Sequence, residues 1–180
     1  MSGVSAIDRA IFDWVIGHRV GLLDAPMWLL SQAADAAILW GVLALVLAAT
    51  KRIGWSGFAQ VLAAVGIASM ITSGILKPLV NRTRPLAVDA ADLIGTLPGS
   101  PSFPSGHATN AFAAATVLAA LLPRFAPALW ILAAAVAFSR VYLGVHYPLD
   151  ITAGALIGVA VGTLVRAMVP RHADDATPTA

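Results

Sequence analysis

Three short polar segments carry the side chains of this 180-residue chain that are best suited to chemistry, and they cover residues 77–85, 102–107 and 139–150. They contain lysine, arginine, serine, histidine and aspartate, and the whole chain has neither cysteine nor glutamate. Guanidinium groups bind phosphate oxygens in pairs, and imidazole can transfer a proton or act as a nucleophile. These residue types therefore favour chemistry on a phosphate group.

The cations of the first and third segments are candidates for neutralising that phosphate. Arg140 follows residues 128–139, which are all apolar or hydroxyl-bearing, and a charge there is costly unless it faces a polar cavity. Lys77 and Arg84 would complete a set of three cations. Taken singly, these two could also be flanking residues whose stems cover apolar surface.

The second segment predicts the start of a helix. Ser105 suits the N-cap position, and Gly106 permits close approach to the free backbone N–H groups, which bind anions at a helix N-terminus. His107, in the first turn, is placed to protonate a leaving oxygen. The alternative is an ordinary loop-to-helix cap.

The third segment holds a histidine and a carboxylate four residues apart, His146 and Asp150, with Pro148 suited to a first helical position. An aspartate one turn away can fix the imidazole tautomer and leave the other ring nitrogen free to attack; a purely structural pair is the alternative. The set suits phosphoryl transfer through a phosphohistidine better than metal-assisted hydrolysis. We therefore predict no metal site and no cofactor.

The elements that must position these segments are membrane helices. The chain is 59% hydrophobic with a mean hydropathy of +0.84, and its 11% of charged residues compares with about 25% in soluble domains. Five apolar runs approach or exceed the length that crosses a hydrocarbon core of about 30 Å; they cover residues 26–50, 58–76, 107–122, 127–144 and 149–169. Gly154, Gly158 and Gly162 are expected to let a neighbouring helix approach closely.

The N-terminal residues follow a different pattern. Ile7, Ala10, Ile11, Trp14 and Val15 recur at helical spacing between charged residues, which predicts an amphipathic helix at the membrane interface. A sixth span over residues 5–25 is the alternative. The predicted fold is thus an all-α, polytopic transmembrane bundle of five to six spans with an amphipathic N-terminal helix. We divide it into residues 1–25, a single transmembrane domain over 26–170, and a polar tail over 171–180.

The positions of the charges predict an orientation. With five spans, one group of cations shares a side that the positive-inside rule makes cytoplasmic; these are Lys51, Arg52, Arg124, Arg166 and Arg171. The three polar segments then share the opposite side. Ser31 and Asp35 are expected to face the bundle interior near it, and a pocket or interface role stays open for Arg82, Asp89, Asp92, Tyr142 and Tyr147. A net charge of +2 without a basic stripe predicts no nucleic-acid partner.

Together the three segments resemble the signature of the type 2 phosphatidic acid phosphatase (PAP2) superfamily of lipid phosphatases and vanadium haloperoxidases. The family pattern KxxxxxxRP, PSGH, SRxxxxxHxxxD is matched at every defined position; the matching residues are Lys77, Arg84, Pro85, Pro104 to His107, Ser139, Arg140, His146 and Asp150. The resemblance covers about residues 70–165, and the small, apolar chain does not resemble the soluble haloperoxidases.

The resemblance implies roles for these residues. It makes His146 the nucleophile, Asp150 the residue that orients it, and His107 the general acid. A phosphate clamp would be formed by Lys77, Arg84, Arg140, Ser105 and Gly106. It also implies a metal-independent site that faces the periplasm or exterior of a multi-pass cell-membrane protein.

The sequence therefore predicts a membrane lipid phosphatase, with undecaprenyl diphosphate as the favoured substrate by analogy. Phosphatidylglycerol phosphate, phosphatidic acid and lipid A phosphate are alternatives. A lipid phosphotransferase or an anion transporter would keep the same cations. The oligomeric state is left open.

Overall fold

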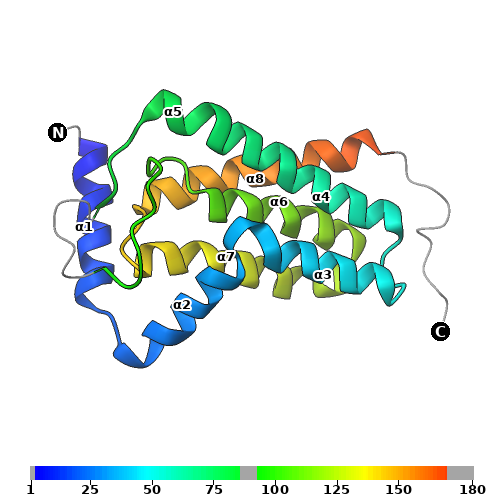
Figure 1. Ribbon diagram of the computed structural model, residues 1–180, viewed down its shortest axis with the longest axis horizontal. Coiled ribbons are helices and arrows are strands. Elements are labelled where there is room, and N and C mark those ends of the chain that lie inside the picture. The colour runs from blue at the N-terminus through cyan, green and yellow to red at the C-terminus, as the bar shows by residue number, and fades with distance from the viewer. Residues whose placement is uncertain (1–2, 86–92, 170–180) are drawn as a thin grey trace.

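The computed structural model describes residues 3–85 and 93–169, and this part of the chain is built of helices without a strand. The longer helices form a bundle whose members run along one axis (Figure 1). In chain order the elements are α1 Gly3–Gly17, η1 Gly21–Leu23, α2 Asp24–Ala33, η2 Asp35–Ala37, α3 Ile38–Ala49, α4 Trp55–Ser69, η3 Met70–Leu76, α5 Lys77–Val80, α6 Gly106–Leu121, η5 Pro123–Phe125, α7 Ala126–Tyr142 and α8 Pro148–Met168.

Within the described residues, three helical stretches are long and apolar enough to cross a membrane: Trp55–Val80, Pro123–Tyr142 and Pro148–Met168. A fourth candidate is the pair Gly21–Ala33 and Ile38–Ala49, which is bent by 68°. The span that the sequence predicted over residues 26–50 corresponds to this pair and stays a prediction. Its helix is broken at Ala37, which adopts a left-handed φ of 61° between the two parts. The predicted count of five to six spans stays a prediction, since α6 has only 16 residues.

Helix α6 occupies the centre of the bundle, between α4, α7 and α8 (Figure 1). Its buried side chains are mostly alanine, and they point toward neighbours in nearly every direction around the helix. Small side chains allow helix backbones to approach closely, which favours dispersion contacts where lipid removes the hydrophobic driving force. The alanine content of this segment thus fits a helix enclosed by other helices.

The predicted close approach of another helix to the glycines of α8 is confirmed. A Cβ atom added at Gly154 would lie 2.7 Å from the Ser105 carbonyl oxygen, and one at Gly162 would lie 2.7 Å from the Ala113 carbonyl oxygen. At Gly158 an added Cβ would collide with the Thr109 carbonyl. The backbones of α6 and α8 therefore touch along three successive turns.

Helix α1 lies across one end of the bundle, where α6 and α8 begin (Figure 1). Its buried side includes Asp8 and Phe12, whereas Ile7, Ile11 and Trp14 are exposed. A helix thus covers Gly3–Gly17, and its exposed apolar side chains suit an interface; the amphipathic interfacial helix stays a prediction. The turn holding Lys51 and the C-terminal end of α8 lie at the other end of the bundle (Figure 1).

Candidate active site

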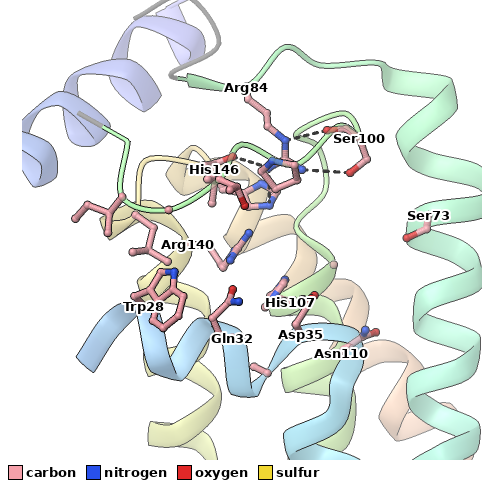
Figure 2. Close-up of a pocket in the computed structure, with 18 of the residues that line it drawn as sticks. Trp28, Gln32, Asp35, Ser73, Arg84, Ser100, His107, Asn110, Arg140 and His146 are labelled. Carbon is pink, nitrogen blue, oxygen red and sulfur yellow. Dashed lines mark hydrogen bonds and ion pairs between the residues drawn. The ribbon is translucent and has the colours of Figure 1, made fainter. Parts of the chain in front are cut away.

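A cavity of about 420 Å³ opens at the end of the bundle that α1 covers, and the three polar segments meet there. Six of the eight predicted site residues line it, namely Lys77, Arg84, Gly106, His107, Arg140 and His146. The other two, Ser105 and Asp150, are fully buried behind that lining. Figure 2 shows His146, Arg140 and His107 pointing toward the space between α2 and the loop that carries Arg84.

Two of the predicted phosphate-binding cations are held by the loop before α6. Lys77 Nζ donates to Ser100 Oγ and to the Pro101 carbonyl, both at 2.9 Å. Arg84 Nε donates to the Ser100 carbonyl at 2.8 Å and Nη1 donates to the Val145 carbonyl at 2.7 Å. Neither cation forms an ion pair with a carboxylate of the described residues. Buried cations without a counterion make a site that attracts an anion.

Arg140, at the end of α7, adds the third cation. It is 7% exposed, and its Nη1 donates to the Ser31 hydroxyl on α2. Its Nε is buried without a hydrogen-bond acceptor among the described residues. A buried donor without a partner is costly, so an acceptor oxygen entering the cavity beside Arg140 would relieve that cost. The polar cavity that the sequence required around Arg140 is therefore present.

Burial and a neighbouring charge also shift the pKa of Arg84. Burial lowers the pKa of the Arg84 guanidinium to about 10, while the charge of Asp150 acts in the opposite direction. Arg84 stays protonated at neutral pH, and a bound phosphate would favour its charged form further.

His146 presents one ring nitrogen to the cations and the other to Asp150. Nε2 lies 3.2 Å from Arg84 Nη1, and Nδ1 lies 3.4 Å from an Asp150 oxygen. Burial lowers the pKa of His146 to about 3; Asp150 opposes this shift, and Arg84 and Arg140 add to it. The ring is therefore neutral, and because a carboxylate accepts the Nδ1 proton, the Nε2 lone pair points toward the clamp.

Asp150 is fixed on both of its oxygens. Oδ2 accepts hydrogen bonds from the Ser102 hydroxyl and, at 2.9 Å, from the Tyr147 backbone N–H. Oδ1 accepts from Arg82 Nη1 at 2.6 Å. Pro148 takes the first position of α8 as predicted, which places Asp150 in the first turn beside His146.

His107 lies in the first turn of α6 on the other side of the cavity. Its Nε2 is 3.2 Å from the Ser31 carbonyl oxygen and 3.8 Å from Asp35 Oδ1. Ser105 caps the helix as predicted, accepting a 3.5 Å hydrogen bond from the Ala108 N–H. An added Cβ at Gly106 would touch only Thr72 Cγ2, at 4.0 Å, so glycine here leaves the helix N-terminus open toward the cavity.

Sequence reasoning missed several residues that shape the site. Ser100, which accepts from Lys77, is an ordinary polar residue of a loop in the sequence. Ser102, which donates to Asp150, lies in the second predicted segment, but the sequence assigned it no role. For Arg82 the sequence left a pocket or interface role open and indicated no ion-pair partner. Nothing but the charge of Asp8 marked it as a candidate for the site. The Tyr142 hydroxyl does not hydrogen-bond to the site. It donates to the Val20 carbonyl and to Asp24, the first residue of α2. Asp89 and Asp92 lie outside the described residues.

The described residues contain no group of three His, Cys, Asp or Glu side chains arranged to hold a metal ion. The arrangement instead combines a neutral imidazole, a second histidine and three cations around one cavity. Chemically, it can bind a phosphate group, attack it from one side and supply a proton from another.

Comparisons with known proteins agree with this arrangement. The sequence profile of the PAP2 superfamily matches residues 57–174. A decaprenylphosphoryl-5-phosphoribose phosphatase of Mycobacterium tuberculosis (strain CDC 1551 / Oshkosh) is 34% identical over 159 residues, which cover 84% of this chain and 86% of that protein. Its counterpart from Mycolicibacterium smegmatis is 48% identical over 80 residues, 44% of this chain and 43% of that protein.

A third relative is an undecaprenyl-diphosphatase of Sulfolobus acidocaldarius, 31% identical over 82% of this chain and 71% of that protein. Among solved structures, Aquifex aeolicus LpxE superposes with a TM-score of 0.77 at 27% identity, over 88% of this chain and 93% of that one. The resemblance read from the three motifs is therefore confirmed, and the chain belongs to the PAP2 superfamily, as a member of its membrane lipid phosphatases.

Proposed function

We propose that this protein hydrolyses a phosphate ester of a membrane lipid through a phosphohistidine at His146. The observation that carries the proposal is the position of Nε2, which faces the cations while Nδ1 faces Asp150. A nucleophile needs a free lone pair on the side where the phosphorus will lie. The low pKa of His146 supports this role, because the ring is neutral before the substrate binds.

The first step forms a bond between His146 Nε2 and phosphorus and breaks the bond between phosphorus and the leaving oxygen. The bound phosphate anion favours the protonated form of His107. The imidazolium then donates its extra proton to that oxygen, which departs as an alcohol, and His107 is left neutral. Asp150 stabilises the positive charge that develops on His146. In the second step His107 removes a proton from water, the water oxygen attacks phosphorus, and inorganic phosphate leaves as the bond to Nε2 breaks.

The charge that spreads over the phosphate oxygens in both steps requires fixed donors. Lys77, Arg84 and Arg140 provide cations, and the open α6 N-terminus at Gly106 provides a backbone N–H group. The Ser105 N–H already donates to the Asp150 carbonyl at 3.0 Å, so Ser105 contributes as the cap of this helix. Because the three cationic side chains are already held by the loop and by α2, they need little reorganisation when the substrate arrives. No metal takes part in these steps.

The wall across the cavity from Arg84 supports a leaving group that is polar but uncharged. It carries Trp28 and Gln32 from α2 and Asp35 from η2, with Asn110 of α6 beside them (Figure 2). A carboxylate accepts hydrogen bonds from hydroxyl groups but repels a second phosphate. We therefore propose that a sugar adjoins the cleaved phosphate, as in the lipid-linked phosphoribose that the mycobacterial relatives are named for.

Undecaprenyl diphosphate, the substrate favoured by the sequence, is the second candidate. The similarity to the Sulfolobus undecaprenyl-diphosphatase supports it. Both candidates share a polyprenyl tail, which would stay in the bilayer while the phosphate enters the cavity. The two differ in whether the group beside Asp35 is a sugar or a phosphate.

The deciding experiment measures phosphate release by purified protein from a panel with EDTA present. The panel holds decaprenylphosphoryl-5-phosphoribose, undecaprenyl diphosphate, phosphatidylglycerol phosphate, phosphatidic acid and lipid A phosphate. We expect the highest kcat/KM on the phosphoribose lipid, and no activity or phosphoenzyme in His146→Ala. Full activity of His146→Ala would refute the phosphohistidine. Phosphate transferred to an added alcohol instead of released would identify a phosphotransferase, and anion uptake without hydrolysis would identify a transporter.

A charge change on the wall separates the two candidates. Gln32→Lys adds a cation beside the leaving group without touching the clamp, so it should raise relative activity on undecaprenyl diphosphate at least about tenfold if the wall selects by charge. An unchanged preference between the two lipids would mean that this wall does not meet the leaving group.

We also propose that the protein lies in the cell membrane with the cavity at the periplasmic or exterior side. The chain contains no cysteine, so a single cysteine introduced at Leu97, near the cavity, or at Lys51, at the other end, gives labelling without background. A membrane-impermeant maleimide should label Leu97→Cys in intact cells and leave Lys51→Cys unlabelled. The reverse pattern would invert the orientation.

A further inference from the structure

A chain of ion pairs joins the N-terminal helix to the carboxylate behind the nucleophile. Arg82 Nη2 donates to Asp8 Oδ2 of α1 at 2.5 Å, and Arg82 Nη1 donates to Asp150 Oδ1 of α8 at 2.6 Å. Both carboxylates are buried, with side chains 4% and 0% exposed. One guanidinium therefore serves two buried carboxylates from opposite ends of the sequence.

Packing holds this guanidinium in place. Its carbon lies 4.2 Å from the centre of the Tyr147 ring, and that ring meets Phe12 of α1 edge to face at 5.4 Å. Asp8 is held from a second side, because its Oδ1 accepts a 2.8 Å hydrogen bond from the Leu149 N–H in the first turn of α8. Asp8 thus has one oxygen on Arg82 and the other on the helix that begins beside His146.

Stability alone does not explain why this buried ion-pair arrangement is present. A buried ion pair seldom stabilises a protein more than apolar residues of the same volume would, because both charges must be desolvated. The two carboxylates nevertheless hold the pKa of Arg82 above its usual value, although burial alone would lower it. The charge of Arg82 is therefore permanent at the site where it contacts Asp150.

We infer that Arg82, held by Asp8, is a positioning residue for the nucleophile. By binding Oδ1 it turns the Asp150 carboxylate so that Oδ2 faces Ser102, the Tyr147 N–H and His146. Without it the carboxylate could rotate, and His146 Nδ1 would lose a fixed acceptor. Helix α1 is then part of the active site through Asp8, although it does not line the cavity. The inference rests on the proposed role of His146.

A double-mutant cycle tests this inference. Wild type, Arg82→Gln, Asp150→Asn and the double variant are purified and assayed on the best lipid of the panel. We expect Arg82→Gln to lower kcat about a hundredfold with KM changed less than about threefold, since the clamp is untouched. In the Asp150→Asn background the same change should cost less than about threefold, because residues that act as a unit are not additive.

Two further variants and a control distinguish a positioning role of Arg82 from a loss of activity caused by misfolding. Arg82→Lys keeps one charge and should recover about tenfold over Arg82→Gln, and Asp8→Asn should lower kcat about tenfold. Asp13→Asn, on the exposed side of α1 in a pair with Arg9, should leave kcat within about twofold. Each protein is checked by size-exclusion chromatography and by its melting temperature.

The outcomes separate two failures. If wild type releases phosphate but Arg82→Gln, folded, keeps its kcat, the positioning role is wrong. Effects of Arg82→Gln that multiply with those of Asp150→Asn would also overturn it, because they would show a general structural effect. If wild type releases no phosphate from any lipid of the panel, the proposed function itself fails.

Discussion

Asparagine at position 150 would test the hydrogen bonding behind His146, the proposed nucleophile, more sharply than alanine would. The change preserves shape and removes one acceptor. The wild-type carboxylate accepts from Arg82 on one oxygen and from Ser102, the Tyr147 N–H and His146 on the other. An amide can accept on only one of these sides, so its NH₂ group must face donors on the other.

Both orientations of the amide damage the site. If the amide oxygen faces Arg82, the NH₂ group faces His146 Nδ1, stabilises the tautomer protonated on Nε2 and removes the lone pair that attacks. If the oxygen faces His146, the NH₂ group opposes Arg82 Nη1 across 2.6 Å. A wrong tautomer in a comparable triad costs about 10⁴ in kcat. The 3.4 Å His146–Asp150 contact is longer than a strong charge-assisted bond, so we expect about 10³, which corresponds to about 4 kcal/mol.

The stability cost should be smaller than the catalytic one. Removing one partner of a fully buried pair costs about 3–5 kcal/mol. The Arg82 side chain is 24% exposed and keeps Asp8 as a partner, so we expect about 1–3 kcal/mol. The protein should remain folded in detergent, which allows kcat and KM to be measured.

The assay is single-turnover phosphate release together with acid-quenched detection of the phosphoenzyme. In Asp150→Asn, formation of the phosphoenzyme should slow by about 10³ while KM changes little, because Lys77, Arg84 and Arg140 are unaltered. A folded variant that forms the phosphoenzyme within about threefold of the wild-type rate would refute the assigned tautomer. So would a rise in KM with kcat unchanged.

Three other predictions concern packing, the clamp and pH. Gly158→Ala should destabilise the protein by about 1–3 kcal/mol through overpacking of α6 and α8, measured by thermal unfolding; Gly66→Ala, with no neighbouring atom within 4 Å, should not, and equal losses would contradict the packing argument. Ser100→Ala removes an acceptor shared by Lys77 and Arg84, so KM should rise about fivefold; a change in kcat alone would argue against this role. Because burial lowers the pKa of His146 to about 3, its contribution to stability is present above about pH 6.5 and is lost as pH falls toward 3. The melting temperature should therefore fall less steeply from pH 7 to pH 4 in His146→Gln than in wild type. Parallel curves of melting temperature against pH would contradict the lowered pKa of His146.

The sequence was sufficient to predict the membrane-helix class and the three segments that meet at one cavity. Charge is so scarce in this chain that each charged residue in an apolar run needs a polar neighbour, which is why Arg140 was informative. The glycines of α8 and the Ser105 cap could also be predicted, because spacing and local backbone chemistry determine them. The roles of the eight site residues remain predictions.

Other features depended on contacts between distant residues. The bend between α2 and α3 depends on a left-handed Ala37, a conformation that alanine rarely adopts and that no sequence rule suggests. Asp8 lies 142 positions from Asp150, and the arginine that joins them stands next to the motif without belonging to it. Ser100 and Ser102 resemble any polar loop residue until the loop folds over the cations. Such roles arise only from tertiary packing.

With the proposed roles, the backbone contact between α6 and α8 would separate a part of the protein that performs the reaction from a part that selects the substrate. His107 and the residues beside His146 belong to the two helices whose glycine contacts fix their separation. The α2 segment, which carries Trp28, Gln32 and Asp35, belongs to the bent pair outside that contact. Substitutions at Trp28 and Gln32, unlike those at Ser31 and Asp35, which contact His107, could thus change which lipid is accepted while the α6–α8 contact keeps His107 and His146 in place. Relatives named for different lipid phosphates are what such a separation would allow evolution to produce.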